Sequence, residues 1–220
     1  MRLKVASIAA LLAVALAAAW LWSAAEGPPR VEPSHVTAPR MAKEALSPAI
    51  QQHRVLLDDT QVRQAIASGT VDRPIKSLLK VRGPLQFGDY QWDDNAIPPG
   101  PTWIRVDLGK QILSIFRDGH EIGTAVIVYG GDNKRTPPGK LHILAKARDH
   151  VSSLYDAPMP FTLRLTGDGV SIHGSTVASG KATHGCVGVP LAFAERLFDA
   201  TKVGDDVVII PSPATASGTS

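Results

Sequence analysis

The residues best suited to chemistry lie in two short segments near the C-terminal end of the chain. The first is Ser171–Ile172–His173–Gly174–Ser175, and the second is Thr183–His184–Gly185–Cys186. A cysteine thiol near its ordinary pKa of about 8.5 is a weak nucleophile, and a nearby imidazole activates it by accepting its proton. The same imidazole can return a proton to a leaving amine. The pattern therefore indicates Cys–His acyl transfer, with Cys186 as nucleophile and His173 as general base and acid.

Backbone features of the two segments suit the same chemistry. Glycine stands beside both reactive side chains, and glycine permits close approach of a substrate backbone. Val170–His173 alternates like a strand, which turns His173 away from the hydrophobic core. We expect backbone N–H groups around Gly185–Cys186 to stabilise an oxyanion. A helix expected to begin at Pro190 would add the positive end of its dipole to stabilise the thiolate.

A zinc site is an open alternative for the same side chains. His173, His184 and Cys186 are all good zinc ligands. No HExxH motif and no clear carboxylate base accompany them, which favours the cysteine mechanism, and no cofactor is predicted. The single cysteine also excludes an intrachain disulfide framework and a cysteine-rich metal cluster.

The elements that must position these residues belong to a β-rich region. Apolar and polar residues alternate there, and Asp118–Gly119 is a strong hairpin signal. We expect strands over 102–108, 112–116, 122–129, 141–147, 161–165, 170–173 and 207–210. A helix is expected over 190–200, with Pro190 suited to its first turn. Residues 101–211 are therefore predicted to form one mainly β domain that carries a helix.

The residues before this β domain have a different composition and pattern. The segment 27–40 holds four prolines and is predicted to be a spacer. Apolar residues recur at three-to-four spacing over 41–81, which predicts two or three short helices, and 83–101 is expected to be an irregular connection. We therefore expect a leader at 1–26, a Pro-rich linker and short helical region at 27–100, the β domain at 101–211 and a disordered tail at 212–220.

The first residues have the order of an export signal. Arg2 and Lys4 precede an apolar run over Val5–Trp22, so the basic end would stay in the cytoplasm. The run approaches the roughly 20 residues that span a bilayer, whereas the small residues Ser23–Ala25 suit a signal peptidase. An inner-membrane anchor through residues 5–22 and a cleaved signal peptide are both open. Either places the rest in the periplasm or on the outer face of the cytoplasmic membrane.

Composition limits the other classes. Hydrophobic residues make up 44% of the 220, but the leader inflates that figure, and the remainder is ordinary for a globular protein. The formal net charge is +3. Lysines and arginines are scattered and no basic stripe with interleaved aromatics occurs, which argues against a nucleic-acid partner.

The two reactive segments, taken with Val187, resemble the signature of the L,D-transpeptidase (YkuD-type) catalytic domain. Upstream, 106–111 and 116–119 resemble its opening hairpin, and Arg135–Thr136–Pro137–Pro138–Gly139 resembles its T-P-x-G loop. The resemblance covers about residues 101–211. It implies a mainly β sandwich or barrel with one or two helices, here preceded by an N-terminal membrane helix and a short helical segment. The stretch between the two segments is shorter than usual for the family, and Gly188 stands where the family usually has Arg or Asn.

The resemblance also implies a reaction and roles. Cys186 would attack the third residue of a peptidoglycan stem peptide and release D-alanine, and an amine of a second stem, or of an acceptor protein, would then give a 3→3 crosslink. His173 carries over as base and acid, oriented by the Gly174 carbonyl. The resemblance assigns oxyanion or pocket positions to His184, Gly185 and Thr183, and groove positions to Tyr129, Arg135, Tyr155, Met159, Ser175 and Gly188.

Two other functions are open for a domain of the same fold. The glycine at position 188 motivates a catalytically weak peptidoglycan-binding module. Water competing at the thioester would instead make the chain an L,D-carboxypeptidase or an amidase-like hydrolase.

Overall fold

The computed structural model describes residues 51–68, 71–131, 134–153 and 156–212. The expected leader, the spacer, the start of the helical region, Tyr155 and nearly all of the tail lie outside these residues. No helix in the described ranges is long and apolar enough to cross a membrane. All the described residues belong to one compact unit.

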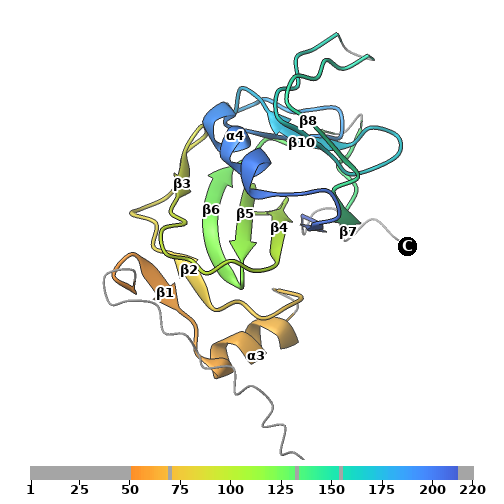
Figure 1. Cartoon of the computed structure of the whole chain (residues 1–220). Helices are drawn as coiled ribbons and strands as arrows, with labels where there is room; N and C mark the ends of the chain where they lie inside the picture. Colours follow the sequence, from red (N-terminus) through yellow and green to blue (C-terminus); the bar gives the residue numbers. More distant parts are fainter. Residues whose placement is uncertain (1–50, 69–70, 132–133, 154–155, 213–220) are drawn as a thin grey trace, which may run out of the picture. The chain divides into compact units, whose positions relative to one another are not determined.

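Two β-sheets build this unit (Figure 1). The larger sheet has the strand order β1–β2–β6–β5–β4–β12–β7, and β3 pairs with β6 beside this path. Its strands are β1 (Arg54–Leu56), β2 (Ser77–Leu79), β3 (Tyr90–Trp92), β4 (Thr102–Asp107), β5 (Ile112–Arg117), β6 (His120–Val126), β7 (Gly139–His142) and β12 (Asp206–Ile210). Strands β4, β5 and β6 form the expected antiparallel meander, and β12 returns parallel to β4.

The smaller sheet carries the reactive segments. Its strand order is β11–β10–β9–β8. The strands are β8 (Ala145–Ala147), β9 (Thr162–Arg164), β10 (Ser171–Gly174) and β11 (Val187–Val189). Strands β10 and β11 run parallel. His173 and Gly174 of the first reactive segment therefore pair with Gly188 and Val189, which follow the second reactive segment in the sequence.

The two described helices begin for different local reasons. Helix α3 (Asp59–Ala67) starts at a capping box, in which the Asp58 carboxylate accepts the Gln61 N–H and the Gln61 side chain accepts the Asp58 N–H. Helix α4 (Leu191–Ala200) starts directly after Pro190, as the sequence predicts. Its C-terminal end is tied to β8, because Lys146 Nζ donates to the carbonyls of Phe198 and Thr201.

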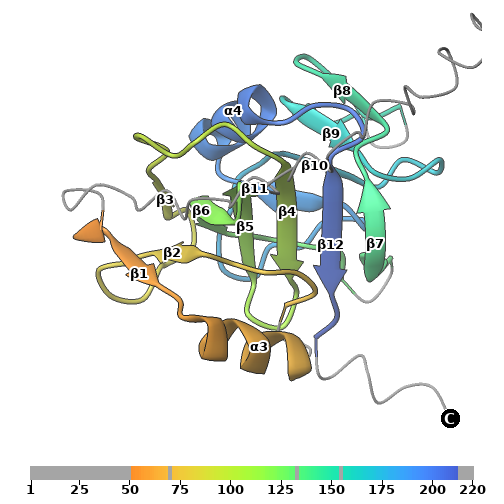
Figure 2. The same ribbon diagram turned by 60° about the horizontal axis from the view of Figure 1, so that its bottom comes forward.

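The main core lies between the two sheets and is covered by α4. Alternation along β4 and β5 turns Ile104 and Ile115 inward, where they meet Ile172 of β10 and Phe193 of α4, all fully or almost fully buried. Helix α3 lies along the opposite side of the larger sheet (Figure 2). A second core cluster lies there, in which Trp103 stacks on Phe116 with ring centroids 4.4 Å apart. The central strands β4, β5 and β6 are therefore largely buried on both faces, whereas β7 at the edge is mostly exposed.

The helical expectation for residues 41–81 is wrong for much of the described part. Helix α3 is present, but β1 and β2 are strands that extend the larger sheet beyond β6. Arg54 of β1 is buried and donates to the Ser77 hydroxyl and to the carbonyls of Asp93 and Glu121. These contacts hold the segment in the sheet, so residue 100 is no boundary between compact units.

Residues 141–147 were expected to form one strand and instead form parts of two. The chain leaves the larger sheet after β7 and enters the smaller sheet at β8. Between them, the Ile143 N–H donates to the Asp205 carbonyl and the Leu144 N–H donates to the Arg164 carbonyl, one bond toward each sheet. The apolar pattern of a strand that changes sheets does not differ from that of a continuous one. Strands β3 and β11 were not predicted: β3 follows a stretch rich in Gly, Pro and Asp, and Gly188 interrupts the apolar residues of β11.

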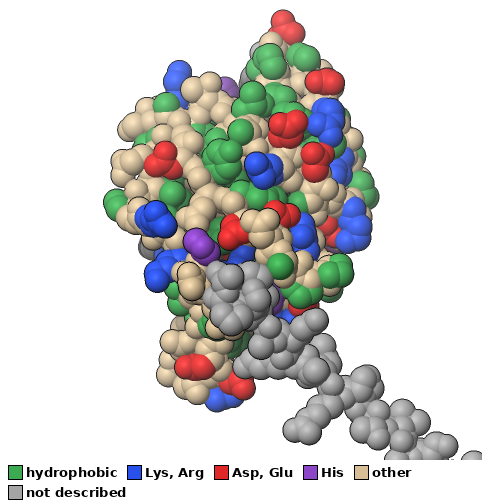
Figure 3. Space-filling model, turned by 60° about the vertical axis from the view of Figure 1, so that its left-hand side comes forward, with side chains coloured by type: hydrophobic (Ala, Val, Ile, Leu, Met, Phe, Trp, Pro, Cys, Tyr) green, Lys and Arg blue, Asp and Glu red, His purple; other side chains and the backbone are tan. Residues whose placement is uncertain are grey.

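Acidic and basic side chains are interspersed over the face shown in Figure 3. Outside its grey atoms, that face presents no extended area of one sign. It would not steer a strongly charged partner by a single-sign field.

Candidate active site

The parallel pairing of β10 with β11 places the two reactive residues on one face of the smaller sheet. His173 is in register with Gly188, and Ile172 is in register with Val187. Ile172 and Val187 are buried in the main core. Cys186 directly precedes β11 and is two residues from Gly188, so it lies on the face of His173, away from the core.

Both side chains line one cavity of about 600 Å³. Its walls come from the loop before β7, from the β8–β9 hairpin and from the segments around β10. Among the polar residues that line it are Lys134, His150, Asp168, Ser171, Thr183 and His184. A second cavity of about 510 Å³ shares Pro158, Ser175 and Thr183 with the first.

His173 is held as a neutral base. Its side chain is buried, and Nδ1 lies 2.9 Å from the Gly174 carbonyl oxygen. A carbonyl only accepts hydrogen bonds, so Nδ1 carries the proton and Nε2 keeps its lone pair. Burial lowers the pKa of His173, the Gly174 bond opposes this, and the charge of His150 lowers the pKa further. The contact expected between His173 and Gly174 is present.

Gly174 itself has no room for a side chain. A Cβ at this position would lie 2.9 Å from Leu191 Cδ1 and 3.2 Å from Pro160 Cγ. The close packing of Leu191 and Pro160 therefore fixes the backbone that orients His173.

Cys186 rests as a thiol. Its side chain is partly exposed, and Sγ lies 3.8 Å from the Gly169 carbonyl oxygen. Burial raises the pKa of the Cys186 thiol, whereas the Ser171 N–H and the Lys134 ammonium lower it and Asp168 raises it. Since the pKa of His173 is lowered and that of Cys186 is raised, both groups favour their neutral forms, and His173 can take the thiol proton when substrate binds.

Two threonine hydroxyls hold the backbone of the nucleophile. Thr183 Oγ1 donates to the Cys186 carbonyl at 2.5 Å, and Thr136 Oγ1 donates to the same oxygen at 3.4 Å. Thr136 also accepts the Gly130 N–H at 2.9 Å and is buried. The T-P-x-G loop therefore fixes the backbone of Cys186 through the Thr136 hydroxyl, a role that the sequence did not indicate.

The N–H groups of Gly185 and Cys186 are available to a ligand. Neither donates a hydrogen bond to another residue in the described part of the chain. Gly185 has φ +99, a left-handed conformation that glycine adopts without strain. These groups are suited to an oxyanion that forms beside Cys186.

The expected contribution of a helix dipole to Cys186 is wrong. Strand β11 lies between Cys186 and α4. Three extended residues cover about 10 Å, and the dipole effect falls off within the first turn.

The predicted groove residues separate into two groups. Met159 and Ser175 line the first cavity together with Thr183 and His184. Tyr129 and Arg135 are not among its lining residues: Tyr129 packs against the main core, and Arg135 is exposed. Tyr155 lies outside the described residues.

Gly188 is enclosed by its neighbours. A Cβ at this position would lie 2.8 Å from Val128 Cγ2 and 2.9 Å from Ser175 Cβ. The Gly188 N–H donates to the Val128 carbonyl at 2.8 Å, which brings the two chains close together. The structure has no space for the Arg or Asn that is usual here in the family that the sequence resembles.

The first cavity also contains residues that were not predicted as site residues. Lys134, Asp168 and His150 line it, and the only signals in the sequence were the basic pair Lys134–Arg135 and the glycine-flanked turn at Asp168. Among the described residues no group of three His, Cys, Asp or Glu side chains is arranged to hold a metal ion. His184 therefore does not complete a zinc site with His173 and Cys186.

Comparison with known proteins places this geometry in a family. The L,D-transpeptidase catalytic domain model YkuD matches residues 101–210. Among solved structures, an L,D-transpeptidase from Stackebrandtia nassauensis is 22% identical with a TM-score of 0.48, covering 55% of this chain and 61% of that one. Mycobacterium tuberculosis L,D-transpeptidase 1 is 23% identical with a TM-score of 0.46, covering 50% of this chain and 62% of that one.

The chain spans about three fifths of the length of these two solved proteins. No curated protein sequence matches it. The family model matches half of the 220 residues and includes both reactive segments. The chain therefore belongs to the L,D-transpeptidase (YkuD) catalytic domain family.

Proposed function

We propose that this protein is an exported cysteine L,D-transpeptidase that forms 3→3 crosslinks between peptidoglycan stem peptides. The observation that carries the proposal is the placement of His173 and Cys186 on one face of the smaller sheet, lining one cavity. The bond from His173 Nδ1 to the Gly174 carbonyl leaves Nε2 as the proton acceptor. Family membership supplies the substrate class.

In the acylation step, His173 Nε2 takes the Cys186 proton while Sγ attacks the carbonyl carbon of the third stem residue. The C–S bond forms, and the oxygen becomes an oxyanion that the N–H groups of Gly185 and Cys186 can stabilise. When the oxyanion collapses, the C–N bond breaks and the protonated His173 gives its proton to the leaving D-alanine. A thioacyl-enzyme on Cys186 remains.

In the second step, an amine of a second stem attacks the thioester. His173 removes a proton from the amine, the new C–N bond forms, and the C–S bond breaks. The proton returns to Cys186, and the enzyme is restored. The second cavity adjoins the first at Pro158, Ser175 and Thr183, which supports an approach of one peptide chain through each cavity.

The external location of the substrate agrees with the leader that the sequence predicts. The basic residues before the apolar run over 5–22 favour an orientation with the remaining chain outside the cytoplasm, as an anchored or a processed protein. A cell-wall substrate is reached from that side.

The decisive experiment incubates the full-length chain and its Cys186→Ala variant with a disaccharide-tetrapeptide that contains diaminopimelate. Intact mass spectrometry of the protein and analysis of the products follow. We expect a Cys186-dependent adduct equal to the donor minus D-alanine, release of D-alanine, and a crosslinked dimer.

Other outcomes would identify other functions. Release of D-alanine with only tripeptide as the second product would show an L,D-carboxypeptidase. Absence of adduct and turnover in a folded protein that still binds peptidoglycan would show a binding module. The packing of Val128 and Ser175 around Gly188 is the structural reason for testing that module directly.

A further inference from the structure

Lys134 is a cation beside the nucleophile whose side chain has no partner among the described residues. A Cβ built on Gly185 would lie 3.3 Å from Lys134 Cγ and 3.4 Å from Cε, so the lysine stem lies along the backbone next to Cys186. Lys134 also lines the cavity that contains Cys186. In the described part of the chain, its ammonium forms no hydrogen bond and no ion pair. An unpaired cation in a cavity is suited to an anionic ligand.

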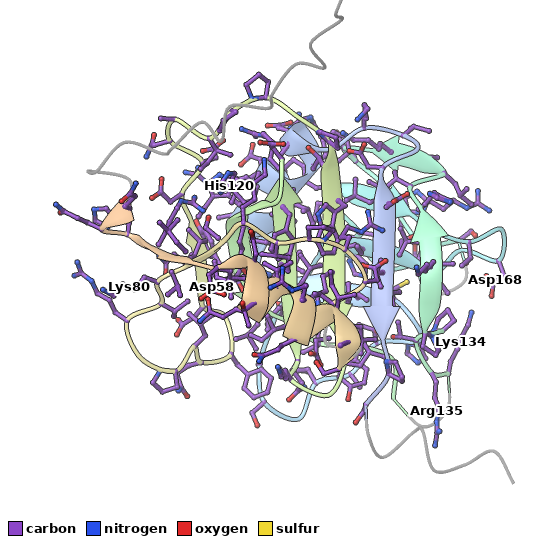
Figure 4. All side chains as sticks on the ribbon, turned by 90° about the horizontal axis from the view of Figure 1, so that it is seen from below. Asp58, Lys80, His120, Lys134, Arg135 and Asp168 are labelled. Carbon is purple, nitrogen blue, oxygen red and sulfur yellow. The ribbon has the colours of Figure 1, made fainter. Side chains whose placement is uncertain are left out.

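The backbone of the loop holds this lysine in place. The Lys134 N–H donates to the Gly131 carbonyl at 3.2 Å. A Cβ on Gly130 would collide with the Lys134 carbonyl oxygen and would lie 2.8 Å from Gly185 Cα, so the loop packs directly on the residue before the nucleophile. Lys80 offers a contrast, since it is exposed and lies on the other side of the molecule in Figure 4.

The other charges near Lys134 are occupied by local contacts. Asp168 accepts a hydrogen bond from Thr166 Oγ1, and its pKa is lowered first by that bond and then by the charges of Lys134 and Arg164. Arg164 donates to the carbonyls of Thr166 and Gly167. Lys134 and Asp168 lie on the same side of the molecule (Figure 4). Of these two cations, Lys134 is the one that no described side chain or carbonyl engages.

The proposed reaction brings a carboxylate to this position twice. The amide that breaks joins the acyl carbon to the nitrogen of a terminal D-residue, and the next carbon carries a free carboxylate. The amine that attacks the thioester, from the D-centre of a second diamino acid or from a free D-amino acid, has the same arrangement. By standard backbone dimensions, the carboxylate carbon lies within about 4 Å of the reacting carbonyl carbon. It must therefore sit close to Cys186.

Building on the proposed function, we propose that Lys134 forms a carboxylate subsite for the amine side of the acyl transfer. It pairs with the α-carboxylate of the leaving residue during acylation and with that of the attacking amine afterwards. Lys134 thereby selects tetrapeptide donors with a free C-terminus over amidated ones. It also selects acceptor amines that carry a neighbouring carboxylate over a lysine ε-amine.

The first test does not depend on enzymatic activity. Because the chain has a single cysteine, iodoacetate and iodoacetamide label the same Sγ, with a new S–C bond and loss of iodide. The ratio of the two rates cancels any change in the thiol pKa. A charge-assisted contact corresponds to a ratio on the order of tenfold.

We expect the ratio of iodoacetate to iodoacetamide to fall on the order of tenfold in Lys134→Met. It should be retained in Lys134→Arg and in the control Lys80→Met. An unchanged ratio in Lys134→Met would overturn the proposal.

The second test uses the reaction itself. Acylation of full-length protein by a tetrapeptide and by its C-terminal amide is compared, and the thioacyl-enzyme is then resolved with D-alanine or with D-alaninamide. Lys134→Met should lower the ratio of kcat/KM for the carboxylate compound to that for its amide on the order of tenfold, because any effect of Lys134 on the thiol is common to both compounds. The donor pair reports on the leaving group, and the acceptor pair reports on the attacking amine.

The two tests separate the two claims. Failure of the unsubstituted protein to be acylated by either donor would defeat the proposed function, while the alkylation ratio would still decide the role of Lys134. An equal loss for carboxylate and amide compounds would show that Lys134 acts only on the thiol, and the subsite would be rejected.

Discussion

The Thr136 hydroxyl connects the T-P-x-G loop to the nucleophile across a long stretch of sequence. It accepts the Gly130 N–H at 2.9 Å and donates to the Cys186 carbonyl at 3.4 Å. Thr183, which is three residues before Cys186 in the sequence, donates to the same carbonyl. The carbonyl of Cys186 is therefore held from two directions, and the positions of Cys186 and of the neighbouring N–H groups depend on a residue outside both segments that carry His173 and Cys186.

Replacing Thr136 with valine should destabilise the protein by about 1–3 kcal/mol, because the buried Gly130 N–H loses its acceptor. Thr136→Ser keeps the hydroxyl and should retain most of the stability. Urea unfolding measures the free energy, and the acylation rate of Cys186 measures the position of the nucleophile. Equal stability of the valine and serine variants would contradict this role.

The fall of kcat/KM on the acidic side of its pH profile (the acid limb) should follow the protonation of His173. Burial and the charge of His150 lower the pKa of His173, so its neutral form persists below the ordinary value of 6.5. Protonation removes the base, and kcat/KM should fall only at pH values below about 6.5. His150→Gln removes one of the lowering charges and should shift the limb to higher pH.

His142→Gln is the matched control for that experiment. His142 is exposed and forms an ion pair with Asp206, and it is absent from the cavity walls. The limb should stay in place in this variant. A limb that moves to lower pH in His150→Gln would refute the assignment.

Adding a side chain at Gly188 should destabilise the site. The Cβ of Gly188→Ala would press on Val128 Cγ2 and Ser175 Cβ, which belong to stiff or short side chains, and overpacking of this kind costs about 1–3 kcal/mol. Combination with Val128→Ala should recover part of the loss, with a coupling free energy of about 0.5–3 kcal/mol in urea unfolding.

Gly167→Ala provides the comparison. No atom lies within 4 Å of a Cβ at Gly167, and its φ is not in the left-handed region. This variant should leave the unfolding free energy nearly unchanged. Strict additivity of Gly188→Ala and Val128→Ala would count against the packing explanation.

The buried carboxyl of Glu121 should make stability depend on pH. Burial raises its pKa, whereas hydrogen bonds from Ser114 and Leu79 and the charges of Arg54 and Arg105 lower it, and the pKa is raised overall. A group with a raised folded-state pKa contributes stability that is full below its unfolded value and is lost as pH rises through the folded value.

Glu121→Gln removes that titration and keeps an oxygen that can accept the Leu79 N–H. The free energy of unfolding of the unsubstituted protein, relative to Glu121→Gln, should therefore decrease as pH rises above the unfolded value of 4.5. Urea unfolding of both proteins across this range is the measurement. A constant difference across pH would show that Glu121 does not titrate in this way.

Much of the catalytic unit could be predicted because its signals are local. Alternation of apolar residues identified β4, β5 and β12, and Pro190 marked the start of α4. His173 and Cys186 were identifiable because their types, their glycine neighbours and their short separation suit one reaction. The pleat of β10 also predicted correctly that Ile172 faces the core and that His173 faces away from it.

Only the tertiary structure decided which distant residues join the site. Lys134, Asp168 and His150 come from loops, which have no periodic pattern, so their approach to Cys186 depends on how the sheets bring those loops together. For the same reason the sequence could not show that Tyr129 and Arg135, which were predicted to line the groove, are absent from the walls of the cavity that contains Cys186. The sequence by itself determined the candidate pair of His173 and Cys186 and the strand that carries His173. The cavity around them, the approach of Lys134 to it and the crowding at Gly188 arise from contacts between segments far apart in the chain, which no local pattern encodes.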